Sequence, residues 1–277
     1  MAPVLAIKEL GVMGEPLPTN APHHTSVDRM HGKVCLVTGG GSGIGRAAAL
    51  KMAEEGAAAV LIAGRREAEI EQAAAECESL GSQGLAIRTD VTREDDVARL
   101  VEIAVERYGR LDVAFNNAGF QEKRAPLQEQ GNAVYDDVFD ANVRSVFLCL
   151  RYQLPVMFAQ GQGRIVVNAS VSGLRNPNPG LSLYSASKAA VISLVRSAAM
   201  EAAPRGVRIN AIAPGRVVTD MMLRSGVGDM ASVAAGLPLR RMGKAEEVAE
   251  AVVWLLSDAA AYVVGHVLAA DGGFLAS

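Results

Sequence analysis

A chain of 277 residues with 50% hydrophobic residues is long enough to bury one large core, and no Pro- or Ser-rich linker divides it after Gly32. The net charge of -3, with no run of Lys or Arg, argues against nucleic acid and against an anionic membrane surface as partners. No apolar run approaches the ~20 residues that cross a bilayer, and nothing at the start suggests a signal peptide. We therefore expect a cytoplasmic protein with one folded domain over residues 32–277.

The first segment of the chain, residues 1–31, has no clear apolar period and contains several prolines. We expect an extension that becomes ordered only against a partner or a neighbouring subunit. The adjacent His23 and His24 have no Cys, Asp or Glu constellation around them, so we predict no metal site. Three widely spaced cysteines favour reduced, buried thiols over disulfides.

Residues 33–57 predict a strand, a tight turn and a helix. An apolar run ends at Thr38, several glycines follow, and then an amphipathic pattern begins. The glycines Gly39, Gly43 and Gly45 have the spacing GxxxGxG. They can adopt backbone angles closed to other residues and let the chain approach a pyrophosphate, which the N–H groups of the next helix would attract. The spacing departs from the commoner GxGxxG, and an ordinary glycine-rich turn is the alternative.

Apolar runs and long amphipathic stretches alternate along the rest of the chain. The runs are VCLVT, AAVLIAG, GLAIRTD, LDVAFNNAG, RIVVNAS, VRINAIAPG and GHVLAADGG. This alternation predicts an α/β domain in which helices cover both faces of a parallel sheet of about seven strands. Right-handed crossovers leave a crevice at the C-terminal ends of the strands, and the glycine turn, NNAG and VNAS all fall at such ends.

Tyr184 and Lys188 lie four residues apart in an apolar pattern that predicts a long helix, and Ser170 lies upstream. Residues at i and i+4 share a helix face, so the ammonium group would lie beside the phenol. A free tyrosine titrates near pH ~10, and a positive neighbour would lower its pKa. The Ser170 hydroxyl could then bind the substrate oxygen that exchanges a proton with the tyrosine. Many surface helices carry such a pair by chance, so the surrounding motifs decide.

Those motifs occur in a characteristic order: TGGGSGIG, Asp90–Val91, NNAG, Asn142, Ser170, Tyr184 with Lys188, and Pro214–Gly215. In this order the chain resembles the short-chain dehydrogenase/reductase family, from about Gly32 to the DGG at 271–273. The resemblance implies a Rossmann-like, doubly wound sheet and an NAD(P)(H)-dependent oxidoreductase that interconverts a secondary alcohol and a carbonyl. It also implies a homo-oligomer, expected to be a tetramer. The alternative is a non-catalytic NAD(P)-binding sensor or scaffold, which loss of a catalytic residue would have favoured.

The resemblance also implies residue roles. Tyr184 would be the acid/base, and Lys188 would lower its pKa and bind the nicotinamide ribose. Ser170 would orient the substrate oxygen, while Asn142 would kink a helix and hold a water-linked proton path; a solvent-facing position is the alternative for an isolated Asn. Thr219 would meet the nicotinamide carboxamide. The expected cofactor contacts are Gly39, Gly41, Ser42, Gly43, Ile44, Gly45, Arg65, Arg66, Asp90, Val91, Asn117, Ala118, Gly119, Tyr184, Lys188, Pro214, Gly215, Val217 and Thr219.

Cofactor choice depends on the end of the second strand, where a carboxylate would bind an NAD ribose and repel a 2′-phosphate. That position is Gly64, and Arg65 and Arg66 follow it. Guanidinium groups suit a phosphate, so we favour NADP(H), with NAD(H) as the alternative. Ser42 stands where many NADP-preferring relatives carry a basic residue, and the two arginines could simply begin a solvated helix.

The substrate pocket would be walled by the segments after Ser170 and after Pro214–Gly215. The second segment is rich in Gly, Ala and Met and suits a mobile lid. Apolar side chains there could line the pocket or pack in the core, namely Leu183, Met221, Met222 and Leu223. Arginines that could meet an acidic group or lie exposed are Arg175, Arg216 and Arg224. A small ketone, a sugar, a steroid-like alcohol and an acyl thioester all stay open as substrates.

Overall fold

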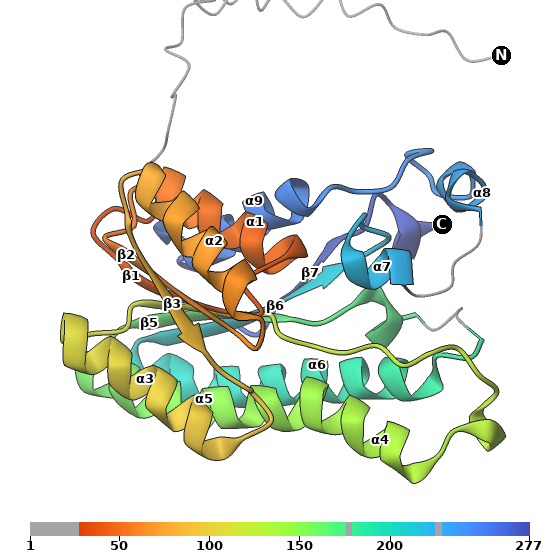
Figure 1. Cartoon of the computed structure of the whole chain (residues 1–277), viewed down its shortest axis with the longest axis horizontal. Helices are drawn as coiled ribbons and strands as arrows, with labels where there is room; N and C mark the ends of the chain where they lie inside the picture. The colour runs from red at the N-terminus through yellow and green to blue at the C-terminus, as the bar shows by residue number, and fades with distance from the viewer. Residues whose placement is uncertain (1–27, 176–178, 225–228) are drawn as a thin grey trace, which may run out of the picture.

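The structure is a computed structural model that describes residues 28–175, 179–224 and 229–277. Seven strands form one parallel sheet in the order β3-β2-β1-β4-β5-β6-β7 (Figure 1), which confirms the predicted fold class and strand number. The strands are β1 (Val34–Thr38), β2 (Ala59–Gly64), β3 (Gln83–Arg88), β4 (Val113–Asn116), β5 (Gly163–Asn168), β6 (Val207–Pro214) and β7 (Val267–Ala270).

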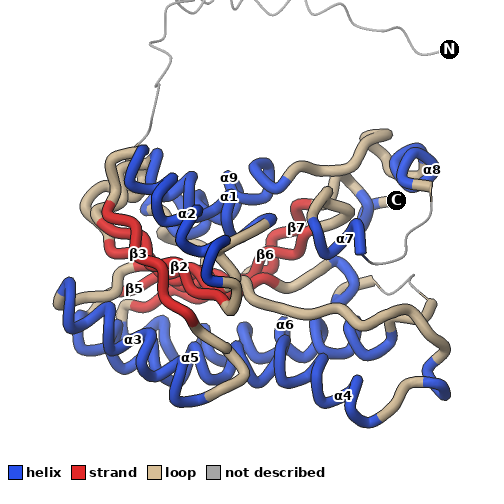
Figure 2. The backbone as a smooth tube through the Cα atoms, in the orientation of Figure 1, coloured by secondary structure: helices blue, strands red, loops and turns tan. Residues whose placement is uncertain are grey.

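Helices cover both faces of this sheet and make three layers (Figure 2). One face carries α1 (Gly43–Glu54), α2 (Glu67–Ser79) and α9 (Ala245–Leu256). The other carries α3 (Glu94–Tyr108), α5 (Ser145–Gln160) and α6 (Ser182–Ala202), with α4 (Asn132–Phe139) beside α6. Two short helices, α7 (Asp220–Arg224) and α8 (Met230–Ala235), follow β6.

The alternation of side chains along β1 explains why both faces need cover. Cys35 and Val37 pack into the core under α1, α2 and α9, whereas Val34 and Leu36 pack into the core on the opposite face. All five side chains of this strand are buried. Successive residues of a strand point to opposite faces, so a central parallel strand reads as a continuous apolar run.

The packed part of the chain already includes residues before Gly32. Met30 is fully buried in the core beside α1, and the Arg29 guanidinium pairs with Glu55 at the end of α1 and with Glu250 on α9. The predicted extension otherwise lies outside the described residues. We therefore place the start of the packed domain a few residues earlier than the sequence indicates.

Candidate active site

The predicted site residues gather at one edge of the sheet, where the parallel strands have their C-terminal ends. The glycine turn follows β1, Arg65 and Arg66 follow β2, Asp90 follows β3, and NNAG begins at the end of β4. Ser170 follows β5, and Pro214 closes β6. Parallel strands bring residues that are far apart in sequence to this edge, so the fold assembles the site without help from long loops.

The glycine turn leaves no room for a side chain at Gly45. A Cβ on Gly45 would lie 2.2 Å from the carbonyl oxygen of Gly39 and 2.5 Å from Nδ2 of Asn117. That Asn117 amide donates to the carbonyls of Thr38 and Gly39, at 3.1 and 3.2 Å. The Thr38 hydroxyl in turn accepts the N–H groups of Asn117 and Ala118, at 3.0 and 3.1 Å. The first motif and NNAG therefore form one rigid unit.

The start of α1 has the chemistry that a dinucleotide needs. Its N-cap, Ser42, makes no side-chain cap to the helix, and its first turn carries no acidic residue, so no side chain of α1 itself satisfies the N-terminal N–H groups. Gly43 adopts a left-handed φ of +53°, and a Cβ there would lie 3.4 Å from the Thr219 side chain. The chain after β6 thus reaches back over the turn. These residues fit a nicotinamide dinucleotide whose pyrophosphate lies at the helix start.

The residues after β2 and β3 are charged and polar. Arg65 is exposed, and Arg66 donates from Nη2 to the Ser42 hydroxyl at 2.9 Å and pairs with Glu69 at 2.6 Å. Burial raises the pKa of Asp90, but hydrogen bonds from Thr92 and the positive charge of Arg65 outweigh it, so the pKa lies below its ordinary value. Asp90 is therefore an anionic acceptor at neutral pH.

The three predicted catalytic side chains lie close together. Ser170 is 7% exposed, and its side chain lies close enough to Tyr184 to oppose the rise in the pKa of the phenol. The Lys188 ammonium lies 5.7 Å from the centre of the Tyr184 ring and donates to the carbonyl oxygen of Asn168 at 2.7 Å. Helix α6 carries both Tyr184 and Lys188, as the i, i+4 spacing predicts.

The lowered pKa that the sequence predicts for Tyr184 is not found in this structure. Burial raises the pKa of Tyr184, with a smaller contribution from the charge of Glu122, and the Ser170 hydrogen bond and Arg216 only partly oppose it. Burial also lowers the pKa of Lys188 to about 8. Lys188 and the Tyr184 phenol are both buried, and burial disfavours the charged form of each group.

Asn142 lies in a π-helical turn, Asp140–Arg144, between α4 and α5. It is fully buried, so the solvent-facing alternative is wrong. Its amide is hydrogen-bonded to both main-chain groups of Phe120, each at 2.8 Å, and its Nδ2 donates to the Ser187 hydroxyl at 3.0 Å. Single π turns often mark functional positions because they re-aim one side chain inside a helix.

Two further polar residues belong to this site and escaped the sequence analysis. Asn168 holds Lys188 through its carbonyl and donates from Nδ2 to Oδ1 of Asn117 at 2.8 Å. Glu122 is 2% exposed, and its carboxylate accepts the N–H of Tyr184 at 3.0 Å. Asn168 could have been found, because it ends a buried strand in VVNAS. Glu122 sits in the polar stretch QEKRAP, which carries no signal of burial.

Comparison with known proteins decides the family. The sequence model described as enoyl-(acyl carrier protein) reductase matches residues 39–275. Cis-4-hydroxycyclohexanecarboxylate dehydrogenase of Sinomonas cyclohexanicum is 42% identical over 244 residues, which cover 88% of this chain and 97% of that protein. The chain belongs to the short-chain dehydrogenase/reductase family.

Solved structures agree with this family. The crystal structure of levodione reductase superposes with a TM-score of 0.86 at 37% identity and covers 90% of this chain and 100% of its own. The crystal structure of NAD+-bound xylitol dehydrogenase gives 0.82 at 33% identity, covering 88% and 100%. This short-chain dehydrogenase/reductase is an NAD(P)-dependent enzyme that interconverts an alcohol and a carbonyl, and the non-catalytic alternative is not supported.

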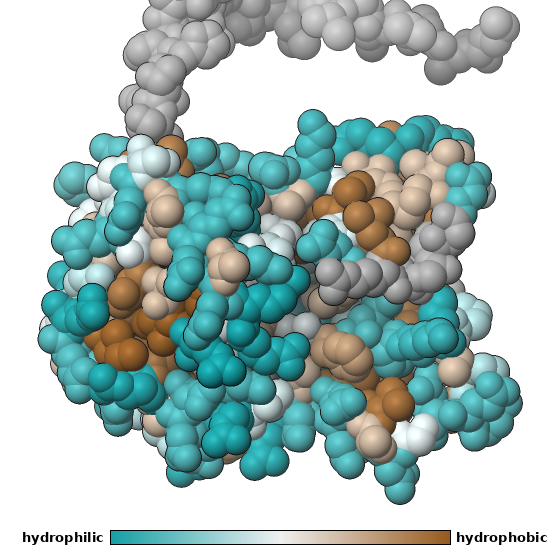
Figure 3. All heavy atoms as spheres, in the orientation of Figure 1, coloured by the Kyte–Doolittle hydropathy of each residue, from teal (hydrophilic) through white to brown (hydrophobic). Residues whose placement is uncertain are grey.

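The segments that would wall the substrate pocket of this enzyme are only partly described, because residues 176–178 and 225–228 lie outside the described ranges. Met221 and Leu223 are 41% and 60% exposed, and Figure 3 shows hydrophobic side chains gathered beside α7. Arg175 donates to the carbonyl oxygens of Phe274 and Ser277, at 3.0 and 2.5 Å, so it holds the C-terminal segment. Of the three predicted arginines, the half-buried Arg216 influences the pKa of Tyr184.

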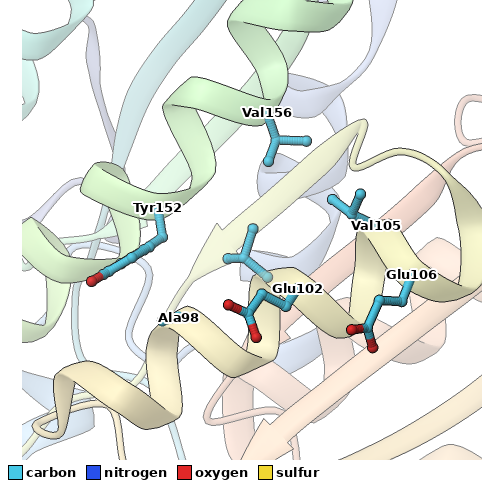
Figure 4. A pocket seen from close by; sticks show the side chains of 7 residues that line it. Ala98, Glu102, Val105, Glu106, Tyr152 and Val156 are labelled. Atoms are coloured by element: carbon cyan, nitrogen blue, oxygen red, sulfur yellow. The ribbon is translucent and has the colours of Figure 1, made fainter.

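A separate apolar hollow lies away from these residues. It has a volume of about 280 Å³ between α3 and α5 and is lined by Ala98, Val101, Glu102, Val105, Glu106, Tyr152 and Val156 (Figure 4). None of the predicted site residues lines it. Within the described ranges, no group of His, Cys, Asp and Glu side chains is arranged to hold a metal ion, and no helix has the length and apolarity to span a membrane.

Proposed function

We propose that Tyr184 is the proton carrier of this alcohol–carbonyl interconversion and that Ser170 and Lys188 are its catalytic partners. The observation that carries the proposal is that the buried Ser170 side chain neighbours Tyr184, with the Lys188 ammonium 5.7 Å from the centre of the ring. Two hydroxyl side chains that are neighbours in this way can both reach one substrate oxygen. In the direction of reduction, Tyr184 gives its proton to the carbonyl oxygen while Ser170 donates a hydrogen bond to that oxygen.

Each residue has the protonation that this role requires. Oγ of Ser170 accepts the N–H of Ser172 at 3.1 Å, which leaves the Ser170 proton available for donation. Lys188, with a pKa of about 8, is still mostly cationic at neutral pH and offsets the negative charge that forms on Tyr184. The carbonyl of Asn168 accepts a hydrogen bond from that ammonium, and the amide of Asn142 holds the main chain at Phe120, in the loop after β4. We propose Asn142 as the fourth member of the site.

The cofactor would be held by the glycine turn, by Asp90 with Val91, by Asn117–Gly119 and by Val217–Thr219. A bound nicotinamide supplies or accepts the hydride. Ser170, Tyr184 and Lys188 orient the substrate oxygen and move its proton, and the cradle at Gly39–Gly45 fixes the dinucleotide relative to them.

We favour NADP(H) over NAD(H). Arg65 and Arg66 after β2 offer guanidinium groups to a 2′-phosphate, Gly64 offers no carboxylate, and Arg66 lies within hydrogen-bonding distance of Ser42. The Arg66 pairing with Glu69 argues the other way, because part of its charge is already neutralised. NADPH should bind at least about ten-fold more tightly than NADH, which corresponds to about 1.4 kcal/mol.

Arg65→Ala should weaken NADPH binding much more than NADH binding, since it removes a phosphate partner. Titration of the purified protein with each cofactor measures both dissociation constants. Arg99→Ala is the matched control, because Arg99 is an exposed arginine on α3 that pairs with Glu106. Equal losses for the two cofactors in Arg65→Ala would place recognition of the 2′-phosphate elsewhere.

The substrate class follows from the relatives. A hydroxycyclohexanecarboxylate dehydrogenase and levodione reductase are among the similar proteins. We therefore propose a secondary alcohol or ketone, with cis-4-hydroxycyclohexanecarboxylate as the first compound to test with NADP+ and with NAD+. The homotetramer and the cytoplasmic location stay predictions.

A further inference from the structure

The mechanism above leaves one buried charge beside the catalytic tyrosine without a role. Glu122, in the loop after β4, is 2% exposed. One of its carboxylate oxygens accepts the Tyr184 N–H at 3.0 Å, and the other is buried with no hydrogen-bond partner among the described residues. A carboxylate is costly to bury unless something in the protein compensates for lost hydration.

Helix α6 supplies part of that compensation. Tyr184 lies in its first turn, where main-chain N–H groups have no partner inside the helix. The N-cap residue is Leu181, whose side chain cannot accept a hydrogen bond, and the first turn has no acidic residue. Glu122 therefore does, from a distant loop, what an N-cap side chain normally does, and its charge lies at the positive end of the helix.

The carbonyl of Tyr184 is tied to the same loop by a second route. The Ser187 hydroxyl donates to the Tyr184 carbonyl at 2.7 Å and accepts from Nδ2 of Asn142 at 3.0 Å. Asn142 is bonded to both main-chain groups of Phe120, two residues before Glu122. Both main-chain groups of the tyrosine are thus connected to the Phe120–Glu122 segment.

We propose that Glu122 is a positioning residue for Tyr184: its carboxylate anchors the first turn of α6 to the loop after β4 and so fixes the tyrosine hydroxyl opposite Ser170. The proposal rests on the proposed role of Tyr184. It assigns no contact with substrate to Glu122.

The charge of Glu122 gives the proposal a second readout. The groups that face Tyr184 are Glu122 from the β4–α4 loop, Ser170 after β5, Arg216 after β6 and Lys188 on α6 itself. Among them, the Glu122 charge raises the pKa of Tyr184 and Arg216 lowers it. Removing the carboxylate should therefore move the titration of Tyr184 to lower pH, which the loss of a purely structural contact elsewhere would not do.

Three variants separate these effects. Glu122→Gln keeps the volume and an acceptor oxygen but loses the charge, whereas Glu122→Met keeps the volume and loses both. Replacing a buried charge by an apolar residue of similar size commonly preserves the fold, and thermal unfolding checks this. Glu129→Gln is the control, because Glu129 is an exposed carboxylate later in the same loop.

The measurements use the full chain without cofactor or substrate. They are amide hydrogen exchange at Tyr184 and the pH titration of its ring carbon by nuclear magnetic resonance, assigned with Tyr184→Phe. In Glu122→Met the Tyr184 amide should exchange at least about ten-fold faster, while in Glu122→Gln it should stay close to wild type. Both variants should lower the titration midpoint of Tyr184, and Glu129→Gln should change neither quantity.

Unchanged exchange in Glu122→Met, equal exchange in the Gln and Met variants, or an unmoved titration in both would each overturn the proposal. None of these readouts depends on turnover. Failure of the proposed function would show instead as retained activity in Tyr184→Phe, so the two failures are distinguishable.

Discussion

At the scale of single residues, the proposed role of Tyr184 depends on its surroundings and not on a lowered pKa, because burial raises the pKa of its phenol. In the proposed mechanism, burial holds the proton of Tyr184 in place, Ser170 orients its hydroxyl, and the Lys188 ammonium, 5.7 Å from the ring centre, offsets the charge that forms when the proton leaves. A proton carrier of this kind makes little binding surface for a cofactor. Its removal should therefore change turnover and leave affinity for the cofactor alone.

Tyr184→Phe should lower turnover by at least ~10²-fold and leave the cofactor dissociation constant nearly unchanged, because only the transferable proton is lost. Steady-state rates and cofactor titration check both parts. Tyr152→Phe is the matched control: Tyr152 on α5 donates to Glu94 at 2.7 Å, away from the site. Retained activity in Tyr184→Phe would rule out the proposed proton carrier.

Lys188 links the site to stability. Its pKa of about 8 in the folded state lies below the ordinary 10.5, so between these values the unfolded chain binds a proton that the folded chain does not. The free energy of unfolding from this group therefore rises with pH across about 8 to 10.5, and the cost of the buried charge is fully present below pH 8. The site is held in a charged state at neutral pH at some expense of stability.

Lys188→Met should be more stable than the protein with Lys188 at pH 7, and the difference should shrink as the pH rises from about 8 to 10.5. Denaturant unfolding at several pH values measures the difference. Both proteins should carry Tyr184→Phe, so that the neighbouring phenol does not titrate. A difference that is constant over this pH range would contradict the lowered pKa of Lys188.

Site features that depend on a few neighbouring residues could be predicted from the sequence, and features that depend on the whole fold could not. The Tyr184–Lys188 pair and the glycine spacing follow from helix and turn geometry within a few residues, so they could be named in advance. The burial of Glu122 and the raised pKa of Tyr184 depend on which side chains the fold brings around them. Neither is written in the neighbouring sequence.

At the scale of elements, the β1–α1 turn and the NNAG segment behave as one unit. The turn leaves no room for a Cβ at Gly45, since it would meet the Gly39 carbonyl at 2.2 Å and Asn117 at 2.5 Å. The same contacts fix the start of α1, where we expect the pyrophosphate. Strain in the turn should therefore affect stability and cofactor binding together.

Gly45→Ala should lower the free energy of unfolding by roughly 1–3 kcal/mol and weaken cofactor binding, because the main chain must move to admit the methyl group. Denaturant unfolding and cofactor titration test this. Gly131→Ala is the control, because a Cβ there would meet nothing within 4 Å and φ is −83°. Normal cofactor affinity in a destabilised Gly45→Ala protein would show that the turn does not shape the cofactor site.

All seven strands could be predicted, since each contains a short apolar run between turn residues. In β1 and β2 every residue but the last is apolar, as expected of parallel strands that are buried on both faces. The helices after β6 could not. Residues 220–224 and 230–235 form α7 and α8, although the Gly-, Ala- and Met-rich sequence after β6 has little regular pattern. Short helices depend on what they pack against more than on their own periodicity.

At the scale of the whole molecule, residues just before β1 hold two helices of one sheet face together. Arg29 pairs with Glu55 and Glu250, Lys51 joins the same carboxylates, and Met30 fills the core beneath them. This short stretch connects α1 to α9, which the sequence places about 200 residues apart. A chain that begins at Gly32, the boundary that the sequence indicates, loses both anchors.

A protein that begins at Gly32 should therefore be less stable than one that begins at Asp28, by about 2–5 kcal/mol. The loss has two sources: a fully buried methionine side chain disappears from the core, and Glu55 keeps its buried position without its arginine. Met30→Ala in the full chain separates the first source from the second. Denaturant unfolding of the four proteins, with equal slopes required, measures these differences. Equal stability of the two shortened proteins would return the domain boundary to Gly32.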